Sequence, residues 1–188
     1  MITKTMAAGI LTVVLMMTMA SAQANAQRAW TCNGATGTVD ETAYDLTQYL
    51  NGAVFLNDWA ASGADAVIRY NITATSGLES GNRTIFKTRI LDNGPQSRVI
   101  LYVRAYNLTT GAITTLGQID SDSYPASSSF QVMETGMGMC SFTGQGGKPA
   151  VNNFDEYAYY VEAHLMRTGW GGNPGLGLLW MKNNHIYC

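Results

Sequence analysis

The stretch 84–107, TIFKTRILDNGPQSRVILYVRAYN, decides the fold class. It holds two runs rich in β-branched and aromatic residues in which apolar and polar side chains alternate, a pattern typical of strands with one buried face. Asp92-Asn93-Gly94-Pro95 separates the runs with residues that favour turns. The pattern predicts two antiparallel strands, 84–91 and 97–107, joined as a hairpin.

In such a hairpin the side chains divide between two faces, because cross-strand partners share a face. One face is apolar and predicts a core. The other collects cationic and tyrosine side chains: Lys87, Arg89, Arg98, Tyr102 and Arg104. Arginine and tyrosine suit anionic groups and flat amphipathic contacts, so we predict a binding surface here for a glycan, an acidic polymer or a protein. The alternative is an ordinary solvated sheet face.

Strand-like composition continues on both sides of this hairpin. Further runs occupy residues 66–75, 112–119, 128–135, 157–168 and 176–182, with Gly, Asn, Pro and Ser clusters between them. Seven runs at this spacing predict an all-β protein, an antiparallel β-sandwich of jelly-roll-like or immunoglobulin-like form. Trp170 lies in the glycine-rich segment 169–177 and is predicted at a loop tip, either exposed or folded back over the sandwich edge.

One short helix is predicted near the N-terminus. Thr38-Val39-Asp40-Glu41 fits a capping box, and Ala43, Leu46 and Leu50 follow at helical spacing. A strand or loop is the alternative, because apolar and polar residues also alternate over 44–50.

Residues 1–26 are predicted to be a cleavable secretory signal peptide. Lys4 gives a positive start, residues 6–19 form an uncharged apolar stretch shorter than a membrane-spanning helix, and Ala24-Asn25-Ala26 fits a cleavage site. Ala20-Ser21-Ala22 is the alternative site, and an uncleaved anchor helix is the alternative interpretation. The sequence therefore predicts a secreted or periplasmic protein with no stable membrane insertion after cleavage.

The remaining residues, 27–188, are predicted to form a single β-sandwich domain, since their number suits one hydrophobic core. A hydrophobic fraction of 46% indicates a globular chain and not a disordered one. The formal net charge of −2 gives no basic excess, so nucleic acid is not an expected partner.

The cysteines Cys32, Cys140 and Cys188 are disulfide candidates, because an exported chain meets an oxidising compartment. Three cysteines allow one disulfide and leave one thiol. All three pairings are open, with Cys32 to Cys140 preferred. The spare thiol either forms an intermolecular bond or is a buried or tail cysteine.

Glu162 and His164 fall on one face of the strand 157–168 and form a possible acid–base or metal pair. The sequence offers no H-E-x-x-H and no Cys-x-x-Cys motif, and it does not supply a third ligand. A polar outer strand face is the simpler explanation. We therefore predict no metal site and no cofactor, and we name no catalytic residue.

These observations favour an exported, non-enzymatic β-sandwich that binds an extracellular ligand or assembles with partner subunits, in an oligomeric state that the sequence leaves open. A secreted hydrolase or lyase with a dispersed site is one alternative. A small outer-membrane β-barrel is another, although its charged strand faces fit lipid poorly.

Overall fold

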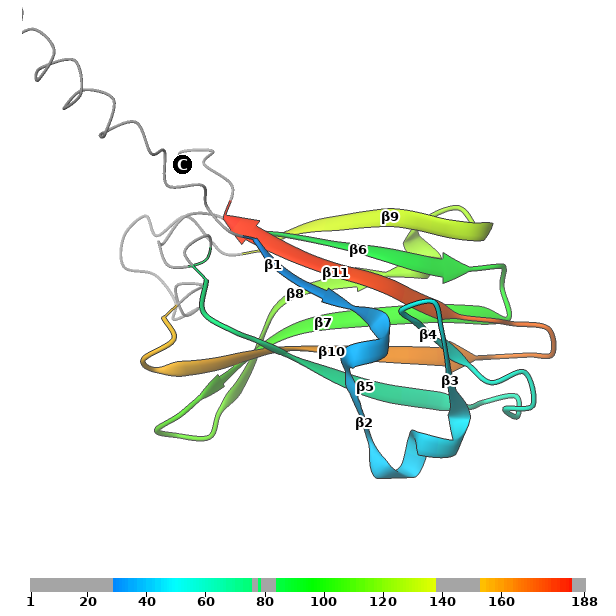
Figure 1. The fold of residues 1–188 in the computed structure, drawn as a ribbon, viewed down its shortest axis with the longest axis horizontal. Coiled ribbons are helices and arrows are strands. Elements are labelled where there is room, and N and C mark those ends of the chain that lie inside the picture. Colours follow the sequence, from blue (N-terminus) through cyan, green and yellow to red (C-terminus); the bar gives the residue numbers. More distant parts are fainter. Residues whose placement is uncertain (1–28, 76–77, 79–83, 138–152, 184–188) are drawn as a thin grey trace, which may run out of the picture.

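The strands pack as two antiparallel sheets, face to face, in the computed structural model of the protein (Figure 1). The structure describes residues 29–75, 78, 84–137 and 153–183. The predicted signal peptide (1–26), Cys140 and Cys188 lie outside these residues. No helix within the described ranges is long and apolar enough to cross a membrane.

The first sheet has six strands, and its main path runs in this order: β3 (Thr47–Leu50), β4 (Ala53–Leu56), β11 (Gly175–Asn183), β6 (Thr84–Asp92) and β9 (Ser127–Met137), with β1 (Trp30–Asn33) also paired to β11. The second sheet has five strands in the order β2 (Thr38–Val39), β5 (Asp65–Ile72), β10 (Tyr157–Arg167), β7 (Ser97–Asn107) and β8 (Ile113–Asp120). Short 3-10 helices, η1 (Gly34–Thr36), η2 (Glu41–Leu46) and η3 (Ser121–Ser123), lie in the connections.

Alternate residues of each sheet fill the core between them. Phe86 and Ile90 of β6 are fully buried, and so are Val99 and Leu101 of β7. Burying each such side chain contributes about 1.5–3 kcal/mol. The predicted antiparallel β-sandwich is confirmed. Because the described strands form two separate sheets, the alternative of a closed barrel is wrong.

The predicted pairing of strand 84–91 with strand 97–107 is wrong. β6 lies between β11 and β9 in the six-stranded sheet, whereas β7 lies between β10 and β8 in the five-stranded sheet. Residues 93–96 therefore carry the chain from one sheet to the other. Pro95 has no backbone N–H to donate across a two-residue hairpin turn. Alternation could not reveal this crossing, since a hairpin and a crossing both turn the same residues toward the core.

The predicted N-terminal helix is present only as η2, a 3-10 segment of six residues. It begins after Asp40, whose side chain accepts a hydrogen bond from the backbone N–H of Thr42. The predicted capping residue Thr38 lies instead in β2, paired with Arg69. Beyond Leu46 the chain continues as β3, so the alternating interpretation holds for this part.

Candidate functional site

The five residues of the predicted binding surface lie on two different faces of the sandwich. Lys87 and Arg89 point outward from β6 in the six-stranded sheet. Arg98, Tyr102 and Arg104 point outward from β7 in the five-stranded sheet. Each residue thus points outward as predicted, but one common surface does not exist. A role in binding stays a prediction for each of them.

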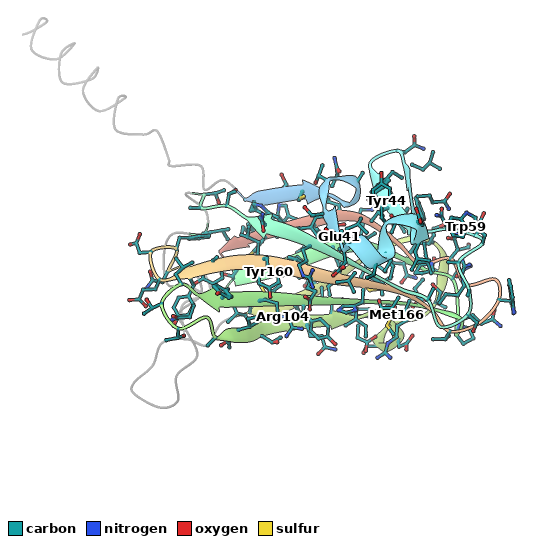
Figure 2. The ribbon with its side chains drawn as sticks, turned by 90° about the horizontal axis from the view of Figure 1, so that it is seen from below. Glu41, Tyr44, Trp59, Arg104, Tyr160 and Met166 are labelled. Carbon is teal, nitrogen blue, oxygen red and sulfur yellow. The ribbon has the colours of Figure 1, made fainter. Side chains whose placement is uncertain are left out.

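On the five-stranded sheet the arginines are paired with carboxylates. Arg104 Nη2 lies 2.9 Å from Glu162 Oε1, and Arg69 Nε lies 3.2 Å from Glu162 Oε2. Arg98 contacts both Asp120 and Asp122 across β7, β8 and η3. Figure 2 looks onto this face, with Arg104, Tyr160 and Met166 labelled along it. The positive charges predicted to bind a ligand are neutralised here by the protein itself.

Glu162 and His164 lie on this same face and contact each other. His164 Nε2 is 3.7 Å from Glu162 Oε1, and His164 Nδ1 is 2.9 Å from Asp65 Oδ2. Partial burial would raise the pKa of Glu162, but the hydrogen bonds and charges of Arg104 and Arg69 outweigh it and keep the pKa below its ordinary value. Glu162 is therefore an ionised carboxylate with both oxygens engaged, a poor arrangement for donating a proton. Among the described residues no group of three or more His, Cys, Asp or Glu could hold a metal ion.

The six-stranded sheet presents a different outer face, which we call the groove face. It is defined by aromatic and aliphatic side chains together with cations: Phe55, Phe130, Leu178, Trp180, Lys87, Arg89 and Lys182. These side chains come from β4, β6, β9 and β11, which lie side by side (Figure 1). An outward sheet face is normally polar, so this composition is unusual.

Two glycines of β11 create the room for this groove. A Cβ at Gly175 would lie 2.7 Å from the Phe55 ring, and a Cβ at Gly177 would lie 3.3 Å from the Phe130 ring. The two phenyl rings lie over the bare backbone of β11 and meet edge to face, with centroids 5.7 Å apart. A register shift between Leu176 and Leu178 then turns Leu178 outward, while Leu176 stays fully buried.

The surface between these rings is hollowed in two adjoining places. Phe55, Phe130, Leu178 and Arg89 line a hollow of about 410 Å³. Trp180, Leu178 and Arg89 line a second hollow of about 150 Å³. Arg89 and Leu178 line both hollows, so the two hollows are neighbours on the groove face.

Cations border the aromatic rings of this groove. Lys87 Nζ and Lys182 Nζ lie 5.8 Å and 5.2 Å from the ring centroid of Trp180. The Arg89 guanidinium carbon lies 6.0 Å from the Phe130 centroid. These distances fall within the range of cation–π attraction, which holds the cations beside the rings without neutralising their charge.

A second group of exposed aromatic residues lies on the loops at one end of the sandwich. Trp59 and Trp170 are 65% and 75% exposed, so the predicted loop-tip position of Trp170 is confirmed in its exposed form. The buried guanidinium of Arg167 joins the two loops. It donates to the carbonyl oxygens of Asp58 and Ala60, on either side of Trp59, and to that of Gly172 in the second loop. Trp59 is labelled at this end in Figure 2.

Cys32, one of the disulfide candidates, has a free thiol in the structure. Cys32 lies in β1, and its sulfur is 2.7 Å from the hydroxyl oxygen of Thr36. No disulfide to Cys32 is therefore formed here, and Cys140 and Cys188 lie outside the described residues.

Sequence reasoning did not find Phe55, Phe130, Leu178 or Trp180 as site residues. The signal available was the alternation of Leu178, Trp180 and Lys182 in β11 with the buried Leu179 and Met181. This alternation predicts that Trp180 points outward, together with Leu178 and Lys182. The contribution of the two phenylalanines could not be read in this way, because they come from strands far apart in the sequence.

No protein-family model matches the chain, and no curated protein matches it. Several solved structures are similar to the chain at low sequence identity. The xylan-binding module CBM15 has 12% sequence identity and a TM-score of 0.49, covering 84% of this chain and 97% of that one. The CBM36-1 domain of a multidomain xylanase from the hindgut metagenome of Trinervitermes trinervoides has 13% identity and a TM-score of 0.46, with coverages of 85% and 100%. The C-terminal CBM6 of LamC from Zobellia galactanivorans has 10% identity and a TM-score of 0.45, with coverages of 83% and 100%.

Proposed function

We propose that this protein is an exported, non-enzymatic β-sandwich that binds a glycan through the groove face. The observation that carries the proposal is the pair of neighbouring hollows, which are lined by aromatic rings and bordered by cations. Aromatic rings give flat apolar surfaces for sugar rings, and arginine and lysine donate hydrogen bonds to polar substituents. Export follows from the predicted signal peptide at residues 1–26.

The size of the groove favours a narrow ligand over a broad protein partner. A stable protein interface buries roughly 800 Å² on each partner, usually over a wide and closely packed surface. Here two small hollows of about 410 and 150 Å³ lie side by side and share Arg89 and Leu178 in their linings. A chain of sugar rings lying along the groove would occupy both hollows at once.

On the five-stranded sheet, the contacts of Glu162 support a structural role for this residue and not a catalytic one. Its two carboxylate oxygens are held by Arg69 and Arg104, and its lowered pKa keeps it ionised. Ion pairs of this kind link β5, β7 and β10 and stabilise the sheet.

The test is affinity electrophoresis of the processed protein in gels that contain single polysaccharides, both neutral and acidic. We expect at least one polysaccharide to retard the wild type and Trp180→Ala to weaken that affinity by about tenfold, as removal of a central aromatic contact typically does. Tyr106→Ala is the matched control, because Tyr106 is exposed on the other sheet. Retardation by none of the polysaccharides, or equal loss in both variants with circular dichroism unchanged, would contradict the proposal.

A further inference from the structure

The two outer faces of the sandwich differ in how their cations are partnered. On the five-stranded sheet, Arg69, Arg98 and Arg104 each contact a carboxylate. On the groove face, Arg89 and Lys182 make no ion pair with any carboxylate in the described part of the chain, and only Lys87 does so, with Glu134 at 2.6 Å. Within the described residues, the charges of Arg89 and Lys182 on the groove face therefore have no carboxylate partner.

This local charge contrasts with the charge of the whole chain. The formal net charge is −2, so the protein as a whole does not attract anions. Three cations and the single carboxylate of Glu134 point outward from β6, β9 and β11 on the groove face. Positive charge concentrated beside a groove on an otherwise acidic molecule indicates a ligand of negative charge.

The cations are also arranged in a row. Arg89 and Lys87 point outward from positions two residues apart on β6, and Lys182 lies opposite Ile85, two residues further along that strand. A strand rises about 3.3 Å per residue, so the three cations are spaced by about 7 Å along the strand direction. Trp180 lies opposite Lys87, in the middle of this row. A polymer with repeated anionic groups would meet the cations in succession.

We infer that the glycan bound by the groove face is an anionic polysaccharide, an inference that rests on the proposed glycan-binding function. Arg89 pairs with a carboxylate or sulfate group through its planar guanidinium, while its neighbours Phe130 and Leu178 contact the sugar rings. Lys182, beside Trp180, contacts a further anionic group, whereas Lys87 is held by Glu134. Polymers with carboxylate groups and polymers with sulfate groups both present such anions, and the probes in the experiment below distinguish between them.

The experiment compares two matched pairs of probes by isothermal titration calorimetry. Polygalacturonate and its fully methyl-esterified form share one backbone and differ in charge, and dextran sulfate and dextran form the second pair. We expect at least one charged probe to bind at least tenfold more tightly than its neutral partner, and the affinity to fall as salt is added. The pair in which the difference appears identifies the anionic group as carboxylate or sulfate.

Two variants distinguish binding at the groove face from nonspecific electrostatic attraction of the anionic probe. Arg89→Gln should weaken binding of the charged probe by about tenfold and leave affinity for its neutral partner unchanged. Arg69→Gln removes the same charge from the opposite sheet and should have no effect on affinity. Equal binding of charged and neutral probes, or equal loss in both variants, overturns the inference and leaves the proposed function in place. Binding to neither pair, and to no polysaccharide in the electrophoresis test, overturns both.

Discussion

At the scale of single residues, Glu162 shows how this protein uses its charges. The Glu162 side chain is 13% exposed, and its carboxylate lies between Arg69 of β5 and Arg104 of β7. Arg104 also stacks over Tyr102, with its guanidinium carbon 4.5 Å from the ring centroid. Tyr102 and Arg104, which the sequence predicted to contact a ligand, thus belong to a network of contacts within the protein. Sequence alternation predicted correctly that they point outward, but it could not show that carboxylates from other strands face them.

The pH dependence of stability should report this network. Since the pKa of Glu162 is lowered in the folded state, its ion pairs stabilise the protein fully above the ordinary pKa of 4.5 and are lost as the pH falls through the lowered value. We expect Glu162→Gln to reduce the free energy of unfolding by about 2 kcal/mol at pH 7. Urea unfolding of both proteins from pH 7 to pH 2 should show the difference shrinking below pH 4.5. A difference that stays constant over this range would contradict the assignment.

At the scale of elements, the turns decide which strands pair. Three Asn-Gly pairs occur in the described chain. Asn33-Gly34 begins the 3-10 segment η1, and the other two pairs behave differently from each other. Asn51-Gly52 has positive φ at both residues, 52° and 79°, and joins β3 to β4 as a two-residue hairpin. Asn93-Gly94 precedes Pro95 and lies where the chain passes from one sheet to the other. The strands could be predicted from alternation, but their partners depend on turn geometry and on contacts between distant segments.

Substitution of Asn51 tests the hairpin directly. A β-branched residue in the left-handed conformation costs about 1–2 kcal/mol, whereas glycine adopts it without strain. We therefore expect Asn51→Val to lower the free energy of unfolding by that amount in urea denaturation. Asn51→Gly is the matched control and should lie within about 0.5 kcal/mol of the wild type. If the two variants lose the same stability, the left-handed backbone conformation at Asn51 does not explain the loss.

At the scale of the whole molecule, the sandwich separates two surfaces of opposite character. On the outer face of one sheet the arginines are paired with carboxylates. On the other, Arg89 and Lys182 lie beside aromatic rings and form no ion pair among the described residues. The sandwich itself could be predicted, because strand composition and spacing are local properties of the sequence. The groove could not, because it exists only where Phe55 and Phe130 meet over the glycines of β11.

Nuclear magnetic resonance mapping of the binding surface tests the central claim most directly. The isotope-labelled processed protein would be titrated with the polysaccharide, or an oligosaccharide of it, that binds in the electrophoresis experiment. We expect the indole N–H of Trp180 and the backbone amides of Arg89 and Leu178 to shift in proportion to occupancy, while those of Tyr102 and Glu162 stay in place. Shifts confined to the five-stranded sheet or to the loops of Trp59 and Trp170 would contradict binding at the groove face.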